Sequence, residues 1–333
     1  MDPLTQASVG AAAAALFSKR GNVRLALTVG ALAGMAPDVD VFIRSDADPL
    51  LALQYHRHFT HSIFLAPLIG LIVAGVWKAL FFRRKQPFKD LATFAVAGAL
   101  THGAIDACTS YGTLLYWPLS SHRESWDIIS IIDPIFTLPL CLLLVVGFAF
   151  RWPKLAKVGL ILCGLYLSFG IFQHFRARAF AEELADARGH SPEMLTVRPS
   201  FGNTLLWRIV YREGPDYYVD AVQIMPGNPP IHYPGKQVQA FSVNDTQTLA
   251  DERTVLVDDI ERFRFFSQGY LFVHLEDRNV LGDLRYAMLP DSVVPLWGIR
   301  VNPAAPEEHV SLEYFRDPSA PNRAHLWDMI WGR

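Results

Sequence analysis

Apolar residues form long runs in the first half of the chain and shorter, interrupted stretches in the second half. Long runs are typical of membrane helices, because a bilayer core of about 30 Å is crossed by about 20 apolar residues. Segment 63–82 is long enough to cross. The first two segments are shorter and rich in small residues, which let membrane helices approach closely. The six predicted helical segments are 5–17, 25–35, 63–82, 91–108, 135–150 and 158–173.

The pattern changes after residue 173, where charged residues become frequent. A polar helix is predicted at 175–188, because Gly189 stands where a helix typically ends. Residues 213–216, Glu-Gly-Pro-Asp, read as a turn between two strands of a hairpin. The other predicted elements are strands at 205–211, 217–224, 271–275 and 296–301 and a short helix at 260–266.

These elements predict a mainly α membrane helical bundle followed by a small soluble α+β (β-rich) domain. The expected boundaries are a multi-helix membrane domain at 1–175, a helical linker at 176–196 and the C-terminal domain at 197–333.

Composition agrees with a membrane part and a water-exposed part. Apolar residues make up 51% of the chain and charged residues only 19%, below the roughly 25% usual in soluble domains. The net charge of −2 gives no global field that would attract nucleic acid. Cys108, Cys141 and Cys163 all fall in apolar segments without a CxxC pair, which argues against disulfides and thiolate zinc sites.

The basic residues predict an orientation. Asp2 precedes the first apolar segment and the first cations follow it, which is not the pattern of a cleavable signal. Clusters of Lys and Arg follow the first, third and fifth segments, and cationic loops stay in the cytoplasm. A multi-pass protein of the bacterial inner membrane is therefore expected, with residues 109–132 and the C-terminal domain on the periplasmic side.

Metal-ligand residue types lie among these apolar segments, in three short motifs. The motifs are Pro37-Asp38-Val39-Asp40, the run 56–62 (His-Arg-His-Phe-Thr-His-Ser), and His102 to Asp106. Carboxylates and imidazoles are costly in hydrocarbon, so their presence there is a functional hypothesis. His102 and Asp106 are four residues apart, which places both on one helix face and lets one helix supply two ligands.

We expect His56, His61, His102, Asp106 and Asp40 as metal ligands. His58 is expected to be peripheral, since three histidines so spaced cannot share one helical face. Catalytic roles are expected for Asp38 and Asp40, with either carboxylate able to complete the ligand set, and for Arg57, which can pair with a carboxylate or a substrate phosphate.

Other polar residues nearby have simpler interpretations. Thr60 and Ser62 can cap the helix that follows them, and Asp133-Pro134 is typical of a helix start. Asp127 is expected to contact the metal ligands and not the metal itself, and His122 is expected to be exposed to solvent.

Imidazole and carboxylate ligands without thiolate favour a divalent ion, zinc first, with manganese or iron as alternatives. Such an ion would lower the pKa of bound water toward about 7, and two ions would clamp a phosphate ester. The sequence leaves the number of ions open.

The order and spacing of these motifs resemble those of the YdjM-type family of bacterial inner-membrane, metal-dependent hydrolases. The resemblance covers about residues 1–180. It rests on the motifs above and on residues 1–6 (Met-Asp-Pro-Leu-Thr-Gln), Gly10, Gly34, Ser110-Tyr111-Gly112, Trp117-Pro118, Asp127 and Asp133-Pro134.

The resemblance implies a multi-helix membrane domain and metal-dependent hydrolase activity without naming a substrate. Some members have His at the position of Gln6. The stretch from Arg198 to Asn203 is similar to an extension in a proteobacterial subset of the family. The helical His and Asp ligands are also similar to those of zinc-dependent phospholipases.

The sequence thus predicts an inner-membrane hydrolase. Its expected partners are membrane lipids and an unknown substrate, for which a lipid or a phosphoester is the candidate, and not nucleic acid. Two other classes stay open. One is a transporter that relays metal ions or protons through its buried His and Asp. The other is a non-catalytic scaffold held together by a structural metal.

Overall fold

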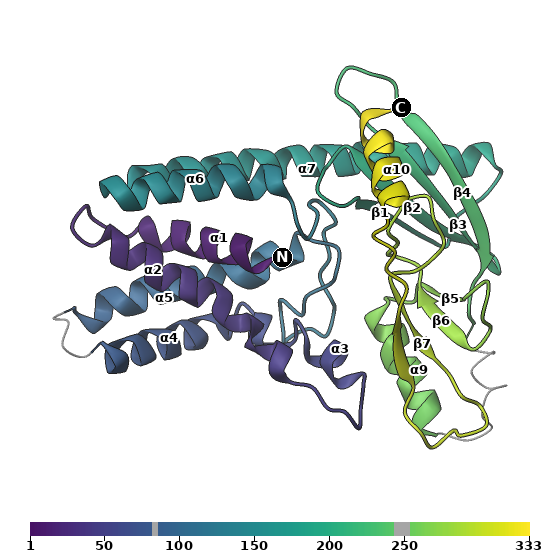
Figure 1. Cartoon of the computed structure of the whole chain (residues 1–333), viewed down its shortest axis with the longest axis horizontal. Coiled ribbons are helices and arrows are strands. Elements are labelled where there is room, and N and C mark those ends of the chain that lie inside the picture. Colours follow the sequence, from purple (N-terminus) through teal and green to yellow (C-terminus); the bar gives the residue numbers. More distant parts are fainter. Residues whose placement is uncertain (82–85, 243–253) are drawn as a thin grey trace. The chain divides into compact units, whose positions relative to one another are not determined.

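The computed structural model describes residues 1–81, 86–242 and 254–333 (Figure 1). It divides into two compact units, each described here by itself. The first unit contains residues 1–43, 55–172 and 201–203, and the second contains residues 44–54, 173–200 and 204–333. The predicted order, helices first and strands afterwards, is confirmed.

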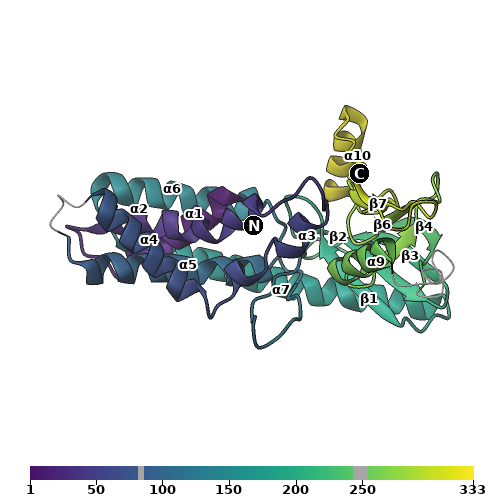
Figure 2. The same ribbon diagram turned by 90° about the horizontal axis from the view of Figure 1, so that it is seen from below.

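The first unit is helical. Its helices are α1 (Pro3–Ala15), α2 (Val23–Met35), α4 (Ala66–Leu80), α5 (Phe88–Ala107), α6 (Pro134–Phe150) and the beginning of α7 (Lys154–Ala187). The short helices η1 (Ala36–Phe42) and η2 (Phe59–His61) carry polar residues, and α3 (Leu51–Tyr55) lies between them in the chain. In the turned view of Figure 2, α1, α2, α4 and α5 run close together.

Two helical stretches in the described part of the chain are long and apolar enough to cross a membrane. They are Val23–Phe42 and Lys154–Ala187. A third span is possible if Leu51–His61 and Ala66–Leu80 count as one, although the two are bent by 85°. The predicted segment 63–82 is thus a shorter helix after a break, and its last residue lies outside the described residues.

Glycines set the distance between α1, α2 and α5. A Cβ at Gly98 of α5 would lie 2.4 Å from the carbonyl oxygen of Gly30 on α2, and a Cβ at Gly10 of α1 would lie 2.6 Å from the same oxygen. Gly34, four residues after Gly30, packs equally closely on the backbone of Gln6. Glycine at such contacts allows backbones to approach more closely than other residues would.

The start of α6 agrees with the sequence. Asp133 caps the helix by accepting hydrogen bonds from the backbone nitrogens of Ile135 and Phe136, at 3.0 and 3.2 Å, and Pro134 is the first helical residue. Asp133 is therefore a cap, as expected.

The predictions for 158–173 and 175–188 as two separate helices were wrong. Helix α7 is continuous from Lys154 to Ala187, because no proline interrupts this stretch. Its second half is fixed to the second unit by Ala177, Ala181 and Ala185, which are fully buried in one cluster with residues of the sheet.

The second unit contains two antiparallel four-stranded sheets. The first is β1-β2-β3-β4, formed by Met194–Pro199, Leu206–Glu213, Asp216–Gln223 and Ile231–Gln239. The second is β5-β6-β7-β8, formed by Leu271–Val273, Val280–Asp283, Trp297–Arg300 and Ser311–Tyr314. Helices α9 (Val255–Phe266) and α10 (Ala320–Trp331) complete the unit.

The predicted hairpin is confirmed, since Glu213 pairs with Asp216 across the turn. The predicted strands 271–275 and 296–301 and the helix at 260–266 are also present, with α9 starting five residues earlier than expected.

A buried arginine fixes the segment after β6 to the first sheet. Arg208 of β2 donates hydrogen bonds to the backbone oxygens of Leu284, Pro290 and Ser292, at distances between 2.7 and 3.3 Å. Complete burial lowers its pKa to about 9. The four hydrogen bonds satisfy the guanidinium, which a buried cation needs.

Residues 44–54 leave the helical unit and belong to the second one. Arg262 of α9 forms a two-pronged ion pair with Asp48, at 3.1 and 2.9 Å, and also pairs with Asp259 at 2.8 Å. Arg262 pairs with both carboxylates and His309 pairs with Asp259, so each member of the group Asp48, Asp259 and His309 has a partner within the chain.

Gly98→Ala should destabilise the helical unit by about 1–3 kcal/mol, because the added methyl group meets the backbone of Gly30. Gly75→Ala is the matched control. A Cβ at Gly75 would meet nothing within 4 Å, so it should be neutral or stabilise α4 by about 0.5–1 kcal/mol. Thermal unfolding in detergent measures both; equal effects of the two variants would contradict the packing described here.

Arg262→Ala should increase amide hydrogen exchange in residues 44–54, because these residues lose their bidentate anchor. Arg264→Ala on the same helix, whose partner is Glu261 on the surface, should not. Exchange read by mass spectrometry compares the two, and equal protection in both variants would show that other contacts hold the segment.

The ion pair between Arg262 and Asp48 should persist at every pH except a strongly acidic one. Burial would raise the pKa of Asp48, but hydrogen bonds and charge from Arg262 outweigh it and lower the pKa. A lowered carboxyl pKa contributes stability above the unfolded value of about 3.9 and loses it as pH falls through the folded value. Protection of 44–54, corrected for intrinsic rates, should therefore be constant from about pH 5 to 8; a loss near pH 6 would contradict this assignment.

Candidate metal centre

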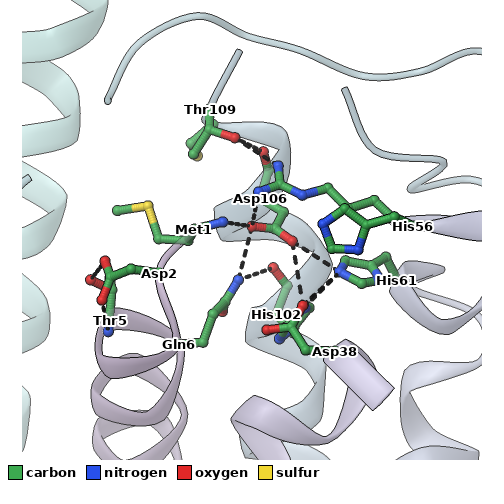
Figure 3. Close-up of polar contacts among 12 residues, drawn as sticks. Met1, Asp2, Thr5, Gln6, Asp38, His56, His61, His102, Asp106 and Thr109 are labelled. Atoms are coloured by element: carbon green, nitrogen blue, oxygen red, sulfur yellow. Dashed lines mark hydrogen bonds and ion pairs between the residues drawn. The ribbon is translucent and has the colours of Figure 1, made fainter. Parts of the chain in front are cut away.

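Three short motifs far apart in the sequence meet in the helical unit (Figure 3). η1 supplies Asp38 and Asp40, η2 supplies Thr60 and His61, and α5 supplies His102 and Asp106. One nitrogen or oxygen atom from each of Asp38, His61, His102 and Asp106 lies within 4.8 Å of all the others. His61, His102 and Asp106 are buried, whereas the Asp38 side chain is 25% exposed.

A glycine allows η2 to reach α5. A Cβ at Gly103 would lie only 2.1 Å from the carbonyl oxygen of His61, so no other residue fits between the two segments. The four-residue spacing of His102 and Asp106 then turns both side chains toward His61, as the sequence predicts. Gly103 is thus as necessary for the site as the polar residues.

The outer nitrogens of both histidines are engaged by acceptors. Nδ1 of His102 lies 2.5 Å from the carbonyl oxygen of Gly34, and Nδ1 of His61 lies 3.2 Å from Oδ2 of Asp40. A carbonyl oxygen and a carboxylate oxygen accept hydrogen bonds, so the hydrogen of each neutral imidazole lies on Nδ1. The hydroxyl of Thr60 donates its hydrogen to Asp40, so it can only accept a hydrogen bond from Nδ1 of His61. This also places the hydrogen of His61 on Nδ1. In the neutral imidazoles, both Nε2 lone pairs therefore point inward.

The two inward Nε2 atoms are 2.8 Å apart, and oxygens surround them. Oδ2 of Asp106 lies 3.1 Å from Nε2 of His61 and 3.5 Å from Nε2 of His102, and Oδ1 of Asp38 lies 3.4 Å from both. Oδ2 of Asp106 forms no hydrogen bond among the described residues, although Nε2 of His61 lies within reach of it. A single proton shared by the nitrogen pair would leave this buried carboxylate oxygen without a hydrogen bond. A divalent cation bound here would satisfy all four atoms.

The other oxygen of Asp106 is held by cationic and polar groups. Oδ1 accepts a hydrogen bond from Nε2 of Gln6 at 3.0 Å, lies 3.3 Å from Nη2 of Arg57 and contacts the amino group of Met1. Thr109 accepts a hydrogen bond from Nη1 of the same arginine at 2.9 Å. These contacts keep Asp106 ionised and fix which oxygen faces the histidines.

Arg57 is a buried positioning residue. Its side chain is 4% exposed, its backbone has a left-handed φ of 60°, and its guanidinium lies 4.8 Å from the centre of the Tyr111 ring. A non-glycine residue rarely adopts such a backbone, and strain of this kind clusters at functional sites. Of the two roles the sequence allowed, a carboxylate or a phosphate partner, the structure contains the carboxylate.

His56 and Asp40 form a second group with Asp38. Oδ1 of Asp40 lies 3.0 Å from Nδ1 of His56, while Oδ2 accepts from the backbone nitrogen of Arg57 and from Thr60. The two expected ligands His56 and Asp40 are thus not part of the four-atom group, and Asp38 belongs to both. Asp40 chiefly holds the 56–61 loop and orients His61.

Sequence reasoning missed several contributors. Thr60 was expected to cap the next helix, but α4 begins at Ala66 without a side-chain cap, and the Thr60 hydroxyl instead bonds Asp40. Ser62 donates to the carbonyl of Trp117 and accepts a hydrogen bond from the backbone nitrogen of Phe64 at 3.2 Å, before α4 begins. Gln6 and Thr109 were not expected to contact Asp106 or Arg57. For Gln6, a polar residue in an apolar helix was the available signal; Thr109 lies just after the end of α5.

The remaining candidates lie elsewhere. His58 packs its ring against Tyr55, Phe59 and Trp117, and is in neither candidate group. His122 is exposed on a loop, and Asp127 is buried outside both groups.

Apolar helices long enough to cross a bilayer, joined to a buried cluster of histidines and aspartates, define a membrane protein with a candidate metal centre. The chain belongs to the YdjM inner membrane protein family, whose sequence model matches residues 1–177. That range contains every residue of the cluster. Comparison with curated proteins and with solved structures gave no match.

His102→Ala should remove the metal, because it removes one of two inward imidazoles. His122→Ala, on the exposed loop, is the control and should retain the metal content of the wild type. Elemental analysis of detergent-purified protein, beside thermal unfolding to show that the variants fold, measures this. Full metal content in a folded His102→Ala protein would exclude the histidine as a ligand.

Proposed function

We propose that this chain is a metal-dependent hydrolase of the bacterial inner membrane, with zinc as the expected ion and manganese or iron as alternatives. His61, His102, Asp106 and Asp38 would hold the ion. The observation that carries the proposal is the pair of inward Nε2 atoms beside an Asp106 oxygen that forms no hydrogen bond among the described residues. A polar cluster built only for stability would satisfy that oxygen.

The surrounding residues prepare the site for chemistry. The carbonyl of Gly34 and the carboxylate of Asp40 keep the histidines oriented with their lone pairs inward, as outer partners of metal ligands do. Arg57 balances the charge of Asp106 in a buried environment. A divalent ion bound here would supply an activated water molecule and polarise an ester.

Asp38 is the residue of the cluster best placed to exchange protons with water, because it is the only one of the four ligands with a partly exposed side chain. In hydrolysis of a phosphoester, the water oxygen bonds to phosphorus and the bond to the leaving alcohol breaks. One water proton passes to a base, and the leaving oxygen gains a proton. We assign the base role to Asp38.

A structural ion is the second candidate, and the number of ligands favours it. Four side chains converge on one point, and four protein ligands close a structural zinc site whereas three leave a position for water. We prefer the catalytic role because Asp38 is partly exposed, so water can replace this ligand on the ion.

We also propose a multi-pass topology with the C-terminal domain in the periplasm. Arg24, after the first basic cluster, donates hydrogen bonds to the carbonyl oxygens of Phe148 and Ala149 at the end of α6. The basic residues after the first and fifth segments therefore lie on the same side, as the charge rule requires. The cluster at 83–85 lies outside the described residues.

Asp38→Asn should lower hydrolysis of a susceptible ester by about 10²–10⁴-fold, the usual contribution of a general base, without unfolding the protein. The assay uses metal-loaded protein in lipid nanodiscs with phosphodiester and carboxylic-ester substrates, and Asp46→Asn, an exposed residue of the 44–54 segment, serves as control. If metal-loaded wild type hydrolyses none of them and Asp38→Asn loses the metal, the ion is structural.

A further inference from the structure

An apolar groove lies beside the candidate metal centre. Its volume is about 520 Å³, and its walls come from the end of α2, from η1 and from one side of α4. The lining includes Leu32, Val39, Ile72, Val76 and Trp77, all of them apolar or aromatic. Thr60 also lines it, and this residue hydrogen-bonds to Asp40 and lies beside His61 in the site. Thr60 is therefore shared by the groove wall and the candidate centre.

We propose that this groove holds a hydrocarbon chain of a membrane lipid, and that the lipid is the substrate whose ester group reaches the candidate metal centre. The inference rests on the proposed hydrolase function and names its substrate class. It commits to one occupant, a lipid chain, for three reasons taken from the structure.

The first reason is the size and chemistry of the groove. At a rise of about 1.5 Å per residue, the stretch of α4 from Ile69 to Leu80 is about 17 Å long. One leaflet contributes about half of the ~30 Å hydrocarbon core, so the groove is long enough for most of one lipid chain. Apart from Thr60 and the indole nitrogen of Trp77, its lining side chains carry no polar atom to bind a polar ligand.

The second reason is that the groove face of α4 is unsuited to a partner helix. Helix contacts in membranes use small residues. Two small residues of α4 are packed inside the unit instead: Ala74 is fully buried, and a Cβ at Gly70 would lie 2.6 Å from the Cα of Val96 on α5. The groove face instead carries Ile72 and Val76, which are 56% and 53% exposed.

The third reason is the position of Thr60 between the two environments. Its hydroxyl is used by Asp40 and His61, so the polar group of the residue belongs to the centre while the residue itself lies in the groove wall. A lipid with its chain in the groove would thus present its first polar atoms next to Asp38, the exposed residue of the cluster.

The test is photo-cross-linking in nanodiscs that contain a phosphatidylglycerol with a diazirine in one acyl chain. The cross-linked peptides are mapped by mass spectrometry in wild type, Ile72→Trp and Leu71→Trp. Ile72 lines the groove, whereas Leu71 is an exposed aliphatic residue of the same helix outside it. Metal content is measured on the same samples, and His102→Ala is cross-linked in parallel.

We expect peptides from α4 and η1 to be labelled several-fold more than the exposed residues of α6, such as Leu142 and Val145. Ile72→Trp should lower that labelling several-fold and Leu71→Trp should not, while both keep the metal. Uniform labelling of all exposed helices, or labelling that Ile72→Trp leaves unchanged, would overturn the proposal. So would cross-links from the groove to a second copy of the chain or to another protein.

The two proposals fail separately. Loss of labelling specificity with full metal content would refute the lipid site and leave the metal centre intact. If wild type contains no metal while wild type and His102→Ala both keep the groove labelling, the hydrolase proposal is refuted and the lipid site is not. The groove would then bind a lipid that is not a substrate, which overturns the substrate assignment.

Discussion

The buried carboxylate of Asp106 is the constraint on which the helical unit depends. An ionised carboxylate in an apolar interior is costly unless both of its oxygens have partners. One oxygen has Arg57 and Gln6, and the other faces two imidazoles. α1, η2 and α5 each contribute to this balance. Gly10 and Gly98 let α1 and α5 approach α2 closely, and Gly103 lets η2 approach α5. The close helix packing and the polar contacts of Asp106 therefore involve the same segments of the chain.

The candidate centre is assembled across an excursion of the chain. Asp38 and Asp40 precede residues 44–54, and His56 and His61 follow them, while the excursion itself belongs to the second unit and is held there by Arg262. Site residues therefore lie on both sides, in the sequence, of a segment that belongs to the second unit.

The structure also separates roles that residue types alone do not distinguish. Asp38 and Asp40 are two residues apart, yet Asp38 faces both inner nitrogens and is partly exposed, whereas Asp40 is buried and orients His61 and His56. A helical η1 turns the two side chains apart, where an extended strand would have placed them on one side.

The sequence by itself determined the order of helices and strands, the β2–β3 hairpin, the Asp133 cap and the pairing of His102 with Asp106, because each follows from local periodicity or spacing. Only the tertiary structure decided that Thr60 and Gln6 contact residues of the candidate centre, and that residues 44–54 join the second unit. These features depend on contacts between segments up to about two hundred residues apart, and no local pattern records which backbones will meet.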